Sequence, residues 1–154
     1  MADCYCGYIP KNKPFRKTIT MPSIRYSETR DIPLDKIMAL YKANEWGSAD
    51  EPEALHKGLI NSHYLVTAWA DDRLAGLGNA ISDGYLVVYY PHLLVHPDYH
   101  LQGIGRELVR RLGVHYQHFH QRILVALPDA IAFYEKCGFE IADITTPTQL
   151  PKGQ

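Results

Sequence analysis

The residues best suited to chemistry lie between Leu93 and Leu108, where a short apolar run ends and a helical pattern begins. Gly103 and Gly105 fall at the predicted start of that helix. Without side chains there, a ligand can approach the unpaired N–H groups of the first helical turn, where the helix dipole favours an anion. The spacing predicts a diphosphate site. Two glycines also occur in ordinary tight turns, so a purely structural interpretation stays open at this point.

The histidines do not indicate a metal site. His115, His118 and His120 lie close in sequence, but only His115 and His118 share a helix face, and no carboxylate or cysteine joins them. His96 and His100 are four residues apart, yet the intervening Pro97 disrupts the helix that would make this spacing meaningful. We therefore expect no metal.

The composition is that of an ordinary folded domain, with 154 residues, 46% hydrophobic and 21% charged. A formal net charge of -1 argues against sequence-independent binding of nucleic acid. No apolar run approaches the ~20 residues of a membrane-spanning helix, and no signal peptide is recognised, so we expect a cytoplasmic protein outside the membrane. Cys4, Cys6 and Cys137 predict no disulfide framework, which fits a reducing compartment.

Hydrophobic periodicity predicts the elements that must position the glycine pair. In order, we expect a strand at 23–28, helices at 33–41 and 50–59, strands at 64–70, 74–81 and 85–95, a helix at 103–119, a strand at 122–127, a helix at 129–137 and a strand at 139–144. Asp50 with Glu53 resembles a capping box, and Gly138 is expected to end its helix. This order predicts an α+β domain with a mixed sheet over residues 23–146, preceded by an extension (1–22) and followed by a tail (147–154).

Pro91 interrupts the apolar run of 85–95, just before the residues that lead into the glycine loop. Proline cannot donate a ladder hydrogen bond, so we expect a bulge or an unpaired position in the middle of this strand. A proline on a plain edge strand explains the residue almost as well.

Three pieces of the sequence resemble the GNAT superfamily of acyl-CoA-dependent N-acetyltransferases. The family's acyl-CoA motif has Gln or Arg, two residues, Gly, one residue, and Gly or Ala, and His100, Gly103 and Gly105 occupy these positions. Residues 94–97 resemble the family's strand end, and residues 133–139 its late helix-to-strand motif. A Rossmann dinucleotide site is not indicated, because no acidic strand end follows the glycines.

The resemblance implies acetyl-CoA as the cofactor, with its pantetheine arm inserted beside a splayed strand and a backbone N–H near Leu94 polarising the thioester carbonyl. The implied cofactor-binding residues are Leu93, Leu94, Val95, His100, Leu101, Gln102, Gly103, Ile104, Gly105, Arg106, Asp129 and Tyr134. Two positions depart from the family. His100 replaces Gln or Arg and carries a pH-dependent charge, and Asp129 replaces an Asn, so it accepts hydrogen bonds but cannot donate them.

The resemblance also implies catalytic roles. Tyr134 occupies the position of the tyrosine that faces the departing sulfur, so it is expected to act as general acid, although an aromatic residue packed beside Phe133 is the structural alternative. No signature marks the group that deprotonates the amine. The candidates are a water chain or one of His92, Tyr89 and Asp83, each of these residues with a structural alternative. Asp83 is also a candidate for contact with the acceptor.

Glu45 and Trp46, between the first two helices, correspond to a wall of the family's acceptor pocket, although Trp46 fits a core position equally well. The predicted function is transfer of an acetyl group from acetyl-CoA to a primary amine of a small molecule or peptide by direct attack, in a homodimer. A non-catalytic acyl-CoA sensor of the same fold and a phosphate-binding scaffold are the alternatives.

Overall fold

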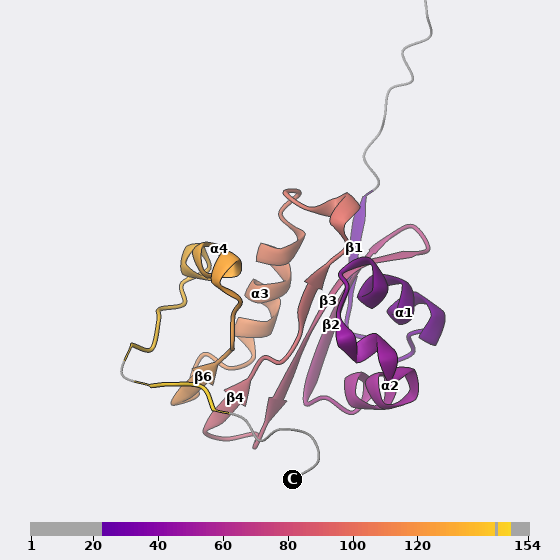
Figure 1. Cartoon of the computed structure of the whole chain (residues 1–154). Helices are drawn as coiled ribbons and strands as arrows, with labels where there is room; N and C mark the ends of the chain where they lie inside the picture. The colour runs from indigo at the N-terminus through magenta and orange to yellow at the C-terminus, as the bar shows by residue number, and fades with distance from the viewer. Residues whose placement is uncertain (1–22, 144, 149–154) are drawn as a thin grey trace, which may run out of the picture.

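The sheet of the computed structural model, which describes residues 23–143 and 145–148, is built mainly from antiparallel strands (Figure 1). Its strands are β1 (Ile24–Ser27), β2 (Tyr64–Ala70), β3 (Arg73–Ser82), β4 (Val87–Tyr89), β5 (Leu93–Val95) and β6 (Gln121–Ile123). The order is β1-β2-β3-β4-β6, with β5 also paired to β3 and with β6 parallel to β4. The predicted α+β class is confirmed. The extension 1–22 lies outside the described residues, and the domain boundaries stay predictions.

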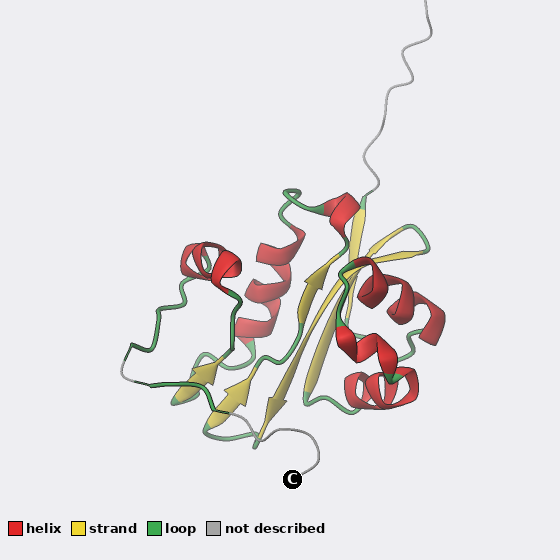
Figure 2. Ribbon diagram, in the orientation of Figure 1, coloured by secondary structure: helices red, strands yellow, loops and turns green. Residues whose placement is uncertain are grey.

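Helices cover both faces of the sheet (Figure 2). On one side lie α1 (Leu34–Ala43) and α2 (Pro52–Ile60), and on the other lie α3 (Ile104–Val114) and α4 (Ile131–Lys136). Short 3-10 helices occupy Gly47–Asp50 (η1), Pro97–Tyr99 (η2) and Pro128–Ala130 (η3). Each face has its own apolar core, so the central strands are buried on both sides.

The two faces of the central strands differ in side-chain size. Leu65, Trp69 and Leu77 face the core under α1 and α2, whereas alanines of the same strands face α3. Glycine also lies on this face of small residues, since a β-carbon at Gly78 would lie 2.8 Å from Cδ1 of Leu112 in α3. The small residues let α3 pack closely on the sheet, which fixes the helix that carries the glycine motif.

A β-bulge divides the predicted strand 85–95 into β4 and β5. Tyr89 pairs with Ile81 and Leu93 pairs with Gly78, so two residues of β3 face Tyr90, Pro91 and His92. One residue is therefore extra, as the interruption at Pro91 predicts. Bulges bend the strand that contains them, and this one lies just after the residues of β4 that pair with β6.

Several predicted boundaries are wrong. No strand forms over 139–143, because the backbone turns there: the N–H of Asp143 bonds the carbonyl of Ile141, and that of Thr145 bonds the carbonyl of Ala142. Residue 144 lies outside the described part. The helix expected over 103–119 ends at Val114, after which turns carry Tyr116 and Phe119 onto the core. The strand expected over 122–127 is reduced to Gln121–Ile123.

The capping box expected at Asp50 is also wrong, because Asp50 belongs to η1 and α2 begins with Pro52, a residue well suited to the first position of a helix. At α4 the prediction holds. Gly138 has φ of +90°, and the N–H groups of Gly138 and Phe139 bond the carbonyls of Glu135 and Tyr134. This Schellman motif ends the helix that carries Tyr134.

Candidate active site

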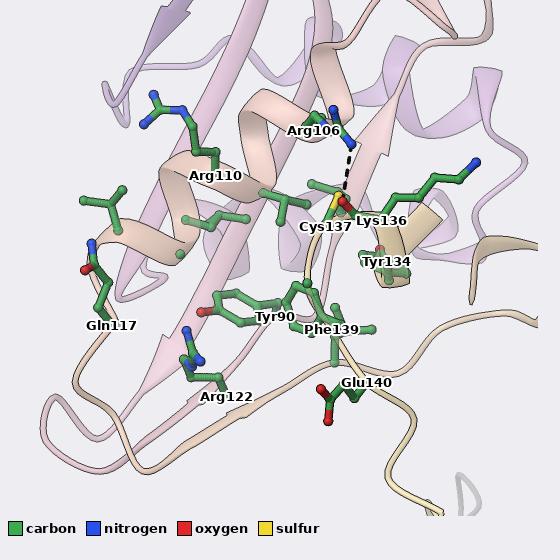
Figure 3. Close-up of a pocket in the computed structure, with 17 residues that line it drawn as sticks. Tyr90, Arg106, Arg110, Gln117, Arg122, Tyr134, Lys136, Cys137, Phe139 and Glu140 are labelled. Atoms are coloured by element: carbon green, nitrogen blue, oxygen red, sulfur yellow. Dashed lines mark hydrogen bonds between the residues drawn. The ribbon is translucent and has the colours of Figure 1, made fainter. Parts of the chain in front are cut away.

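A large cleft opens where β5 separates from β6. β4 stays paired with β6 through Ile123, and the N–H of Tyr90 donates the last hydrogen bond to the Ile123 carbonyl at 2.9 Å. Beyond this point β5 pairs with β3 alone. The cleft has a volume of about 770 Å³ and lies between β5, α3 and the end of α4 (Figure 3). A cleft of this size accommodates a cofactor.

Many of the side chains that line this cleft are basic or aromatic. Its lining includes Tyr90, Leu93, Arg106, Arg110, Arg122, Tyr134, Lys136, Cys137 and Phe139, with Glu140 as its one carboxylate among the described residues. Arg110 is held by Glu107 through two hydrogen bonds of 2.7 Å, whereas Arg106 donates to the carbonyl of Lys136 at 3.3 Å (Figure 3). The excess of cations suits an anionic ligand.

The start of α3 provides free backbone donors close to the cleft. Gly103 precedes the helix with φ of +82°, a left-handed conformation that glycine adopts without steric cost. The N–H groups of Ile104, Gly105 and Arg106 belong to the first turn, and no side chain caps it. The residues therefore fit the predicted diphosphate group. Gly105 has a different constraint, because a β-carbon there would lie 3.2 Å from Cζ of Phe133 in α4.

One edge of β5 faces away from β3. The N–H of Asn79 bonds the His92 carbonyl and the N–H of His96 bonds the Ala75 carbonyl, so even-numbered residues of this segment pair with β3. Antiparallel alternation then turns the backbone groups of Leu93 and Val95 toward the open edge. The Val95 carbonyl accepts a hydrogen bond from Nε2 of His100 at 2.9 Å, so His100 holds the glycine loop against β5.

Tyr134 lies in the wall of the cleft, half-buried between Phe133 and Phe139, with ring centroids 5.1 and 5.8 Å away. Burial, with a smaller contribution from Cys137, raises the pKa of the phenol. Tyr134 is therefore protonated at neutral pH, which is the state required of a general acid.

A second cavity, of about 410 Å³, lies on the side of α2 and η1. Pro91 and His92 line it, together with Asn79 and Ile81 of β3 and apolar residues of α2. Tyr90 and Leu93, the neighbours of Pro91 and His92, line the larger cleft instead. The segment 90–93, which contains the bulge, therefore borders both cavities.

His92 is fixed within an aromatic cluster beside the second cavity. Its Nδ1 lies 2.7 Å from the hydroxyl of Tyr41, and its ring packs edge-on against Trp46 at 5.3 Å. Burial lowers the pKa of His92, so its imidazole is neutral at neutral pH. Sequence reasoning missed Tyr41, because no local signal distinguishes it from the other apolar residues of its helix.

The structure brings together only some of the residues predicted for the cofactor. Leu93, Arg106 and Tyr134 line the cleft, whereas Leu94 is 2% exposed and belongs to the core under α1. Leu101 is fully exposed, Gln102 donates to the Asp98 carbonyl at 3.3 Å, and Asp129 is exposed in η3 without lining the cleft. Lys136 and Arg122 are cleft cations that sequence reasoning did not select.

The residues predicted for the acceptor are also dispersed. Trp46 contacts His92 but lines neither cavity, and Glu45 is exposed with φ of +55°. Asp83 accepts hydrogen bonds from the N–H groups of Tyr85, Leu86 and Val87, which lowers the pKa of its carboxyl and gives it a role in the turn before β4. Tyr89 lies on β4 with 38% of its surface exposed and lines neither cavity.

The described residues contain no group of three or more His, Cys, Asp or Glu placed to hold a metal ion. In the same part of the chain, no helix has the length and apolar character needed to cross a membrane.

A sheet that opens beside a helix N-terminus, with a tyrosine lining the opening, is the arrangement that the resemblance to the GNAT superfamily implies. Comparison with known families agrees, since the model of the GNAT acetyltransferase domain matches residues 61–141. The chain belongs to the GNAT acetyltransferase family, whose members generally use acyl-CoA. No curated protein matches the chain.

Solved structures share the fold. A GNAT-family acetyltransferase from Streptococcus pneumoniae is 26% identical, with a TM-score of 0.75 over 86% of this chain and all of that one. A protein from Deinococcus radiodurans classed as an acetyltransferase is also 26% identical, with a TM-score of 0.72 over 84% of this chain and 88% of the other. AAC(6')-Iy, solved with a bisubstrate analogue containing CoA, shares the fold at 14% identity and a TM-score of 0.66, over 84% of this chain and 99% of its own.

Proposed function

We propose that the protein is an N-acetyltransferase that moves an acetyl group from acetyl-CoA to a primary amine of a small molecule or peptide by direct attack. The observation that carries this proposal is the pair of cavities on either side of the bulge. The larger has an excess of cations and includes Arg106 from the first turn of α3, and the smaller combines apolar residues with Ser48, Glu51, Asn79 and His92. We place the reacting amine and thioester at residues 90–93, which border both cavities.

In the proposed cofactor site, main-chain N–H groups make more of the contacts with the cofactor than side chains do. The first-turn N–H groups of α3 hold the diphosphate, with Arg106 beside them. The open edge of β5 presents the N–H groups of Leu93 and Val95 to the arm and the acyl oxygen, as an added strand would be bound. When bound, the thioester supplies an acyl group with a thiolate as its leaving group.

Tyr134 is the proposed general acid. Its phenol keeps its proton at neutral pH and lines the same cleft as Leu93, so it can transfer a proton to the departing sulfur. The amine must lose a proton before it can attack. The smaller cavity is open to solvent, so we assign this proton to water. Tyr89 lines neither cavity and is not assigned this step.

The experiment is a screen of primary amines with acetyl-CoA, following release of free CoA. The wild-type protein should turn over at least one amine class, and Tyr134→Phe should lower kcat by about 100-fold or more with little change in the KM for acetyl-CoA. If acetyl-CoA binds tightly and no amine is acetylated, the protein is the non-catalytic sensor. If plain diphosphate binds as well as CoA, the site is a phosphate scaffold.

A cytoplasmic location and a homodimer stay predictions from the sequence. Light scattering of the purified protein at micromolar concentration tests the second of these. A mass of 17.5 kDa would contradict the dimer.

A further inference from the structure

We propose that Tyr41 fixes His92 as the neutral Nε2–H tautomer, so that His92 presents a hydrogen-bond donor to the acceptor rather than a proton-accepting base. This inference rests on the proposed function, because it assigns the amine acceptor to the smaller cavity. It narrows the acceptor to primary amines that carry a carbonyl or hydroxyl oxygen near the amine. Tyr41 is then a positioning residue that acts through His92.

The argument begins with the hydroxyl of Tyr41. The side chain is 0% exposed, and burial raises the pKa of its phenol far above the ordinary value, so the hydroxyl keeps its hydrogen. Among the described residues, Nδ1 of His92, at 2.7 Å, is its one hydrogen-bond partner. A buried hydroxyl hydrogen without an acceptor is strongly disfavoured. The hydrogen therefore points at Nδ1, which must be unprotonated.

A neutral imidazole carries one hydrogen, so the second nitrogen of His92 must hold it. Burial lowers the pKa of His92 and keeps the ring neutral. Protonation would place a hydrogen on Nδ1 as well and force the Tyr41 hydroxyl to turn toward apolar neighbours. Both effects oppose proton uptake by His92, which makes it a poor general base.

The ring has little freedom to reorient. Tyr41 and Trp46 pack edge-on against it at centroid distances of 5.6 and 5.3 Å. The main chain is held as well, because the N–H of His92 donates to Oδ1 of Asn79 at 3.1 Å and its carbonyl accepts from the N–H of Asn79 at 3.1 Å. Nδ2 of Asn79 in turn donates to Oγ of Ser62 at 2.8 Å. The donor is therefore pre-positioned before any ligand binds.

Nε2 of His92 is accessible from the smaller cavity. His92 lines this cavity, and no residue in the described part of the chain bonds its Nε2. In the same part, no buried side-chain nitrogen or oxygen lacks a partner, so Nε2 must be reached by solvent. The lining of the cavity combines apolar residues, among them Leu55, Leu59, Ile81 and Pro91, with the polar residues Ser48, Glu51 and Asn79. A fixed N–H donor in this cavity favours ligands with an oxygen lone pair at the matching place.

The tautomer can be measured without any turnover. Two-bond ¹H–¹⁵N spectra of the ¹⁵N-labelled protein at pH 7 should show His92 protonated at Nε2, and Tyr41→Phe should convert it to a mixture of tautomers. Tyr116→Phe is the matched control, since the Tyr116 hydroxyl makes a bond of the same 2.7 Å length to Nδ1 of His63. This control should leave His92 unchanged. A wild-type His92 protonated at Nδ1 overturns the inference, whatever the activity of the protein.

Kinetics test the donor role. His92→Gln keeps an N–H donor and has no basic nitrogen, whereas His92→Ala has neither. The assay uses the best oxygen-bearing amine of the screen and its oxygen-free analogue, such as phenylalaninamide and phenethylamine. His92→Ala should reduce the preference for the oxygen-bearing amine, measured as the ratio of kcat/KM values, about 2- to 10-fold, and His92→Gln should retain most of it.

Equal loss of activity in His92→Gln and His92→Ala would show that the lone pair of His92 matters, and it would overturn the donor role. If the wild-type protein acetylates no amine, the proposed function fails, and the tautomer measurement alone decides the inference about Tyr41 and His92.

Discussion

Gly105, in the first turn of α3, lies against the ring of Phe133 in α4, and a β-carbon on residue 105 would come within 3.2 Å of Cζ. The contact brings the free N–H groups of α3 next to the helix that carries Tyr134. Arg106 makes a second connection through its hydrogen bond to the carbonyl of Lys136. The proposed diphosphate site and the proposed general acid are therefore mechanically linked, although they are about thirty residues apart in sequence.

Gly105→Ala tests this linkage. The added methyl group must displace the Phe133 ring by a few tenths of an ångström, so the free energy of unfolding should fall by about 1 kcal/mol and the KM for acetyl-CoA should rise. Urea unfolding and initial rates measure the two effects. Gly113→Ala, in the same helix with nothing within 4 Å, should instead raise the free energy of unfolding by about 0.5–1 kcal/mol. Equal stability of the two variants would contradict a functional contact between Gly105 and Phe133.

The raised pKa of Tyr134 predicts where kcat begins to fall at alkaline pH. A phenol with a pKa above 10.0 stays protonated at pH values where an ordinary tyrosine has begun to ionise. The midpoint of any alkaline fall in kcat that is due to this group should therefore lie above pH 10.0. A pH series of kcat at saturating substrates measures this midpoint. A fall in kcat centred below pH 9 that Tyr134→Phe abolishes would contradict the assignment.

Much of the site could be predicted because it depends on local chemistry. Gly103 needs its left-handed conformation whatever surrounds it, and Pro91 cannot donate a ladder hydrogen bond in any sheet, so both positions signal their role in the sequence. The order of strands and helices up to α4 could also be predicted, because hydrophobic periodicity is a local property of the sequence. These features require no knowledge of partners distant in sequence.

The features that could not be predicted depend on such partners. The role of Tyr41 appears only when His92, fifty-one residues later, is placed against it. The apolar residues Phe139 and Ile141 suggest a strand, but Phe139 packs on Tyr90 and Ile141 is left 63% exposed. The sequence shows Asp83 as a carboxylate in a turn, and only its three backbone partners show that it stabilises the turn before β4.

Asp83→Ala should therefore affect stability and leave the KM for the acceptor unchanged. The substitution removes the oxygen that accepts from three successive N–H groups in the turn before β4, so the Tm should fall. Asp83→Asn, which keeps an acceptor oxygen, should recover most of the loss. Thermal unfolding and acceptor titrations measure the two effects. A large rise in the KM for the acceptor in Asp83→Asn, at unchanged Tm, would show instead that Asp83 contributes to acceptor binding.

The thiol of Cys137 provides a probe of the cleft that needs no activity. Cys137 lines the cleft, and burial raises the pKa of its thiol, partly offset by Arg106. Because the thiolate is the reactive form, alkylation by iodoacetamide at pH 7 should be slower than for a free cysteine. A Cys4→Ser, Cys6→Ser variant leaves Cys137 as the one remaining cysteine of the three in the sequence.

Saturating desulfo-CoA, which has no thiol to consume the reagent, should slow this alkylation at least several-fold, because the arm passes Leu93 and Tyr134 in the same cleft. Inorganic diphosphate should protect much less, since it occupies the start of α3 and leaves the cleft open. In denaturing urea the alkylation rate of Cys137 should rise to that of a free cysteine, and neither ligand should change this rate. If desulfo-CoA binds in the folded protein and the alkylation rate of Cys137 is unchanged, the cofactor lies outside the space between β5, α3 and α4, and Tyr134 cannot be its general acid.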